Sequence, residues 1–270
     1  MSAIMAPDGV REPDRFFQTA AGRRLECVRH RPAAPAAGAP PVVLLHEGLG
    51  SVAMWKDFPA ALAEAAGAEV LVYSRYGYGR SEPLQAPFGT DYMHREALES
   101  LPALLDALEI ERPVLFGHSD GASIALIHAG AAQRPVAGLI VEAPHVFVED
   151  LTIASIEEAK QVFETTDLAR RLAKYHDDAD RSFRGWNDIW LHPDFRTWNI
   201  ERCLPGIAAP VLAIQGADDE YGTLAQIDAI QAGVAGPVER LVLERCKHSP
   251  HRDRREAVLE ASARFIAALR

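Results

Sequence analysis

Residues 113–126 read Pro-Val-Leu-Phe-Gly-His-Ser-Asp-Gly-Ala-Ser-Ile-Ala-Leu, and they contain the most informative motif of the chain. Its first half is a short apolar run typical of a strand, and its second half is compatible with a helix that begins at Asp120. Between them lies Gly117-x-Ser119-x-Gly121, whose small residues allow a sharp and closely packed strand-to-helix turn. Such a turn holds the serine oxygen clear of the sheet and aims the next N–H group at an oxygen that becomes negative. The stretch therefore predicts a nucleophilic serine at position 119.

The composition indicates one large globular domain with a modest insertion: 270 residues, of which 48% are hydrophobic and 24% charged. A net charge of −10 argues against nucleic acid or an anionic membrane as a partner, because both are polyanions. The three cysteines are scattered, so no disulfide framework or thiolate metal site is indicated, and we expect no metal and no cofactor. Residues 1–12 resemble a loose leader without the apolar segment of a signal peptide, and no run approaches about 18 apolar residues. These features predict a cytoplasmic protein.

Strand and helix signals alternate along most of the chain. A hairpin is expected at residues 15–30, and further strands at residues 42–46, 69–73, 114–117, 139–143, 210–216 and 238–243. Helices are expected after Asp120 and at residues 91–110, 222–234 and 254–269. This order predicts an α/β fold with a mostly parallel, doubly wound sheet that is covered on both faces.

Residues 147–205, called the cap below, carry helical patches and no strand signal. We expect them to form a helical cap inserted after the sixth strand, with residues 1–146 and 206–270 as the core. A capping box at Ser155-x-x-Glu158 predicts a helix start. Phe183, Trp186 and Trp190 recur at helical spacing, and we expect them to line an apolar substrate pocket. The alternative is that these aromatic side chains only join the cap to the core.

A serine hydroxyl needs a base to remove its proton, and the base is best oriented by a carboxylate. The candidates must lie on loops that follow strand carboxyl ends, where Ser119 lies. Asp219 follows the strand at residues 210–216, and His248 follows the last strand. Alternative acids are Asp218 and, more remotely, Glu142, and the alternative base is His251.

The loop after the strand at residues 42–46 is the candidate for binding an oxyanion. A tetrahedral oxyanion needs a second N–H group opposite that of Asp120, and a glycine lets the backbone approach closely. We expect Gly48 to supply this N–H group. His46 is expected to hold the loop by hydrogen bonds rather than to react.

Together these motifs resemble the α/β-hydrolase superfamily, from the hairpin to the final helix. They are Leu44-Leu45-His46-Glu47-Gly48, Gly77-Tyr78-Gly79-Arg80-Ser81, Gly117-His118-Ser119-Asp120-Gly121, Gly216-Ala217-Asp218-Asp219 and His248. The resemblance implies the chain order serine, acid, histidine. It assigns Ser119 as nucleophile, His248 as base and then acid, and Asp219 as the orienting carboxylate. Gly48 and Asp120 would form the oxyanion hole.

Two positions depart from the family pattern. Glu47 stands where the family usually has a glycine, and Asp120 places a carboxylate directly after the nucleophile. We expect the Asp120 side chain to turn away from the oxyanion.

The serine nucleophile disfavours the dehalogenase and epoxide-hydrolase branches of the superfamily, which use aspartate, and the dienelactone branch, which uses cysteine. The resemblance thus implies a serine carboxylic-ester hydrolase that cleaves a small or medium ester or lactone through an acyl-enzyme. Alternatives are a C–C bond hydrolase or lyase of the same fold, and a non-catalytic ligand receptor. Arg75, Arg80, Arg184 and Arg196 are candidates for holding a substrate carboxylate, and a homo-oligomer is left open.

Overall fold

A single sheet organises the molecule, as the computed structural model shows for residues 12–270, the part of the chain that the structure describes. The leader expected at residues 1–12 lies almost wholly outside these residues. The strands are β1 (Asp14–Ala20), β2 (Arg23–His30), β3 (Val42–Leu45), β4 (Val70–Tyr73), β5 (Val114–His118), β6 (Gly138–Glu142), β7 (Val211–Gly216) and β8 (Val238–Leu243). Their order is β1-β2-β4-β3-β5-β6-β7-β8. Only the β1–β2 and β2–β4 pairs are antiparallel among these strands, so the prediction of a mostly parallel sheet is confirmed.

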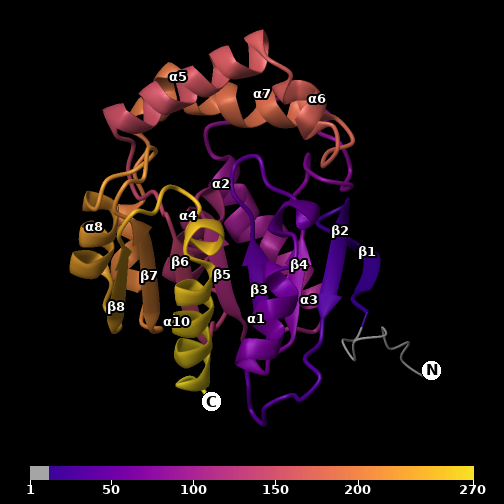
Figure 1. Ribbon diagram of the computed structural model, residues 1–270, viewed down its shortest axis with the longest axis vertical. Helices are drawn as coiled ribbons and strands as arrows, with labels where there is room; N and C mark the ends of the chain where they lie inside the picture. The colour runs from indigo at the N-terminus through magenta and orange to yellow at the C-terminus, as the bar shows by residue number, and fades with distance from the viewer. Residues whose placement is uncertain (1–11) are drawn as a thin grey trace.

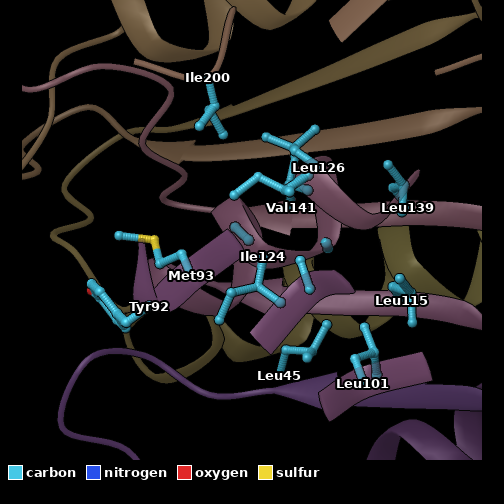
Figure 2. Packing of buried hydrophobic residues seen from close by; sticks show 14 of the residues in the cluster. Leu45, Tyr92, Met93, Leu101, Leu115, Ile124, Leu126, Leu139, Val141 and Ile200 are labelled. Carbon is cyan, nitrogen blue, oxygen red and sulfur yellow. The ribbon is translucent and has the colours of Figure 1, made fainter. Parts of the chain in front are cut away.

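Helices cover both faces of the sheet (Figure 1). One apolar layer contains α1 (Phe58–Ala66) and α10 (Arg255–Ala267), and it meets strand residues such as Val42 and Phe116. The other contains α3 (Leu101–Ala107), α4 (Asp120–Gly130) and α8 (Ala225–Gly233). In this second layer Leu115, Leu139 and Val141 of the strands pack with Ile124 of α4 (Figure 2). Alternate residues of one strand therefore face opposite layers, as the pleat requires.

The helix expected at residues 91–110 is interrupted. It consists of α2 (Tyr92–Arg95), a π-helical turn at Glu96–Ser100 and α3. Pro102 has no N–H group and cannot continue the regular hydrogen-bond ladder, which accounts for the irregular turn before α3.

The cap lies between β6 and β7 and contains α5 (Asp150–Thr165), α6 (Leu168–Leu172) and α7 (Ala179–Trp190), followed by two 3₁₀ turns at Pro193–Thr197 and Glu201–Gly206. Figure 1 shows α5, α6 and α7 together beyond one end of the sheet.

The predicted helix start at Ser155 is wrong. Helix α5 begins at Asp150, and the Ser155 hydroxyl donates a hydrogen bond to the carbonyl of Glu220 on the core. A tertiary contact therefore accounts for this serine better than a cap does. Within residues 12–270, no helix has both the length and the apolar character needed to cross a bilayer.

Candidate active site

Ser119 lies at the turn between β5 and α4 with φ 53° and ψ −118°. A side chain seldom adopts this backbone conformation, so the neighbouring packing must enforce it. A Cβ atom on Gly117 would overlap the backbone of Gly121 and Ala122, and one on Gly121 would overlap the carbonyl of Leu45. Both glycines are therefore required for the close contact of strand and helix that presents the serine.

Ser119, His248 and Asp219 are joined by hydrogen bonds, although they come from three separate loops. Ser119 Oγ lies 3.0 Å from His248 Nε2, and His248 Nδ1 lies 2.8 Å and 3.0 Å from the two Asp219 carboxylate oxygens. A carboxylate only accepts hydrogen bonds, so Nδ1 carries the proton and Nε2 is free to accept the serine hydroxyl. The arrangement is competent for removal of the serine proton.

Asp219 is held as an ionised carboxylate. Gln215 Nε2 donates to Oδ2 at 2.7 Å, and the Tyr221 N–H donates to Oδ1 at 2.8 Å. Burial alone would raise the pKa of Asp219, but the adjacent His248 ring and the Tyr221 N–H hold the pKa below its usual value. The charge remains available to stabilise a protonated His248.

The alternative acid and base contact each other instead of the serine. His251 Nδ1 lies 3.0 Å from Glu142 Oε2, and the His251 N–H donates to Glu142 Oε1. Glu142 ends β6 and His251 lies on α9 (Pro250–Asp253), so this buried pair anchors the segment that follows His248. Asp218 is exposed beside Asp219, and Asp219 is the carboxylate that meets His248.

The loop after β3, residues 46–51, approaches the serine turn and is held by His46. His46 Nε2 accepts the Arg75 N–H at 3.0 Å, so Nδ1 donates to the Glu47 carbonyl at 2.7 Å. Burial and the nearby Arg75 keep the pKa of His46 well below its ordinary value, consistent with this neutral form. His46 thus has the structural role expected from the sequence. Next to it, the Gly48 Cα packs directly under the Trp186 indole, where any Cβ would overlap the ring.

The Asp120 carboxylate turns into a buried polar network, as expected. Tyr92 donates its hydroxyl at 2.6 Å, Trp190 donates Nε1 at 3.3 Å, and Arg75 Nη2 lies at 3.6 Å. As the first residue of α4, Asp120 still has an N–H group without a partner inside the helix. That N–H group is the one proposed for the oxyanion hole.

The cap aromatics make contacts of different kinds. Trp186 covers Gly48, Trp190 joins the Asp120 network, and Phe183 stacks on Phe163 of α5 with ring centroids 3.8 Å apart. A cavity of about 310 Å³ between the cap and the core is lined by neighbouring residues of α7, including Gly185 and Ile189. That these three aromatics bind substrate stays a prediction.

The arginines proposed for a substrate carboxylate all have carboxylate partners within the protein. Arg75 pairs with Asp120, Arg80 with Asp177, Arg184 with Asp180 and Arg196 with Asp150. Structural pairing therefore accounts for each of them.

One cluster near the site was not among the residues expected from the sequence. His118, next to the nucleophile, lies 2.6 Å from the carbonyl of His248 through Nε2, and its Nδ1 lies 3.6 Å from Glu47 Oε2. The signal that could have indicated it was the glutamate at position 47, where the family pattern has a glycine.

Comparison with known proteins shows the family of the chain. A model described as the alpha/beta hydrolase family matches residues 42–261, so the chain belongs to that family. Serine hydrolase BPHL of Homo sapiens is 28% identical over 187 residues, a match that covers 67% of this chain and 64% of the human protein. The match thus spans less than two thirds of that relative's length.

Solved structures share the fold at low sequence identity. Proline iminopeptidase from Mycobacterium smegmatis superposes with a TM-score of 0.79 at 19% identity, covering 95% of this chain and 98% of that one. The enol-lactonase from Burkholderia xenovorans LB400 superposes with a TM-score of 0.70 at 19% identity, and the match covers 93% of this chain and 100% of that one. These likenesses establish the α/β-hydrolase fold and leave the reaction to be argued from the site.

Proposed function

We propose that this protein is a serine hydrolase that cleaves a small or medium carboxylic ester or lactone through an acyl-enzyme. The observation that carries the proposal is the continuous hydrogen-bonded chain from Ser119 Oγ through His248 to Asp219. The likeness in fold to an enol-lactonase and the sequence similarity to a human serine hydrolase support it.

The reaction has two stages. Ser119 Oγ attacks the carbonyl carbon while His248 Nε2 takes its proton, and the N–H groups of Asp120 and Gly48 receive the oxyanion. The protonated His248 then gives its proton to the departing alkoxide. In the second stage His248 takes a proton from the water that attacks the acyl carbon. It then returns this proton to Ser119 Oγ as the bond between Ser119 and the acyl group breaks and the acid is released. A lactone follows the same course, with its alkoxide joined to the acyl group.

Steady-state turnover tests this proposal. The purified protein is assayed with p-nitrophenyl acetate, longer acyl esters and a set of simple lactones, with Ser119→Ala as the matched control. We expect wild-type hydrolysis with a pre-steady-state burst and no enzymatic turnover by the variant. Turnover of a vinylogous diketone without ester hydrolysis would favour the C–C hydrolase alternative, and binding of these compounds without turnover would favour a receptor.

A further inference from the structure

Behind the catalytic histidine, His118 occupies a buried position between two loops that both serve the site. Its side chain is 1% exposed and its ring centroid lies 5.3 Å from that of His248. Nε2 contacts the His248 carbonyl at 2.6 Å, and Nδ1 faces the Glu47 carboxylate at 3.6 Å. Both neighbours accept hydrogen bonds and neither donates, so the doubly protonated imidazolium is the form that suits this position.

Other charged groups around His118 are already paired. Glu142 on β6 binds His251 on α9, and the His251 ring centroid lies 5.0 Å from that of His118. His248 is engaged with Asp219. Glu47 is thus the carboxylate left to His118. Burial alone would lower the pKa of His118, but Glu47 and Glu142 raise it to about 9.

Glu47 is itself fixed to the loop after β3. Its carbonyl accepts hydrogen bonds from His46 Nδ1 and from Arg75 Nη2, at 2.7 Å and 2.9 Å. The next residue is Gly48, which is proposed to bind the oxyanion. A contact between Glu47 and His118 therefore connects the oxyanion side of the site with the base side.

We propose that Glu47 and His118 form a positioning pair that fixes the catalytic histidine relative to the oxyanion loop. The inference rests on the proposed function, because it assigns the pair to the Ser119 reaction. Neither side chain takes part in bond making. A displacement of about 1 Å in a catalytic group can lower a rate by about 100-fold, so loss of the pair should lower kcat more than it changes KM.

The kinetic test compares two substitutions of Glu47 with wild type. Glu47→Ala removes the partner, and we expect kcat to fall about 10- to 100-fold with KM changed less than about threefold. Glu47→Gln keeps the shape and its amide can donate to a neutral His118, so we expect kcat near wild type at neutral pH. His128→Gln is the control, because His128 is also buried against a backbone carbonyl but lies far along α4.

The pH profile supplies a readout that a merely structural role would not move. Wild-type kcat should decline as pH rises through about 9, when His118 loses its proton and its Nδ1 lone pair faces the Glu47 carboxylate. Glu47→Gln should lack this decline. A wild-type kcat in Glu47→Ala, or the same alkaline decline in wild type and Glu47→Gln, would overturn the proposal.

Nitrogen NMR of histidine-labelled protein separates this inference from the proposed function, since it needs no substrate. We expect both ring nitrogens of His118 to carry protons at pH 7 in wild type and only one in Glu47→Gln. A neutral His118 in wild type contradicts the positioning pair whatever the enzyme hydrolyses. Absence of ester and lactone turnover with a protonated His118 contradicts the proposed function alone.

Discussion

Individual residues fix the positions of Ser119 and of its hydrogen-bond partners. The positive φ angle of the serine is imposed by two glycines that cannot accept a Cβ atom. Asp219 and His248 were predictable because each directly follows a recognisable strand or strand-end loop, and parallel strands bring such loops to one edge. Their hydrogen bonds agree with the roles that we assign to them.

Replacement of Asp219 tests the orienting carboxylate. In Asp219→Asn the amide would favour the wrong tautomer of His248, and we expect kcat to fall about 10⁴-fold with little change in folding. Steady-state kinetics with p-nitrophenyl acetate measures the change. Asp218→Asn is the matched control, since its exposed carboxylate is adjacent in sequence and should be dispensable. Equal losses in the two variants would exclude the specific role of Asp219.

Gly48→Ala tests the contact between the loop after β3 and the cap. The new methyl group would overlap the Trp186 ring, so we expect the free energy of unfolding to fall by about 1–3 kcal/mol. Urea denaturation measures the loss, and Gly222→Ala, where a Cβ meets only ordinary contacts, is the control. In a Gly48→Ala/Trp186→Ala double variant the two losses should not add, because they share one contact. Simple additivity would contradict the packing described.

Among the helices and loops, the cap is attached to the core through polar contacts as well as aromatic ones. His176 Nδ1 accepts the Gly79 N–H and its Nε2 donates to the Leu49 carbonyl, both at 3.0 Å. Ser182 of α7 donates to the Gly77 carbonyl at 2.7 Å. The cap is therefore joined to the glycine-rich loop after β4 and to the loop after β3.

His176→Ala should loosen the cap. It leaves the Gly79 N–H and the Leu49 carbonyl without their buried partner, which we expect to cost about 1–3 kcal/mol. Limited proteolysis should then cut within residues 147–205 before the core. His192→Ala is the control, because that cap histidine is 48% exposed. Equal protection of wild type and His176→Ala would show that these bonds do not hold the cap.

The sequence predicts a residue's place where a local pattern marks it, and it does not predict contacts between distant residues that no local pattern marks. The strands, the serine turn and the helical nature of the cap follow from short apolar runs and glycine spacing. The pairing of Glu142 with His251 joins residues 109 positions apart, and the Arg75–Asp120 pair is equally remote from local patterns. The start of α5 was misplaced because Ser155 serves a contact with the core rather than a helix end.

For the whole molecule, buried histidines set the pH dependence of stability. Burial lowers the pKa values of His46, His145 and His176, so below about pH 6.5 the unfolded chain takes up protons that the folded chain does not. Stability should therefore decrease as the solution is acidified. His118 acts in the opposite direction: its raised pKa stabilises the fold fully below about 6.5, and this contribution is lost as pH rises through about 9.

Urea unfolding between pH 5 and pH 9 tests these opposite contributions of the buried histidines to stability. We expect the free energy of unfolding to be greatest near neutrality, with the alkaline decline reduced in His118→Gln. A free energy of unfolding that is constant from pH 5 to pH 7 would contradict the assignment of the three buried histidines as neutral.

Mass spectrometry of the protein after reaction with a fluorophosphonate tests directly whether Ser119 is an activated nucleophile. We predict one covalent adduct per chain, located on the peptide that contains Ser119. The adduct should be absent from Ser119→Ala, and its formation should be strongly slowed in His248→Ala. Ser119 is 7% exposed, so a small reagent is the appropriate probe. An unlabelled wild-type protein, or an adduct that persists in Ser119→Ala, would contradict the assignment of Ser119 as an activated nucleophile.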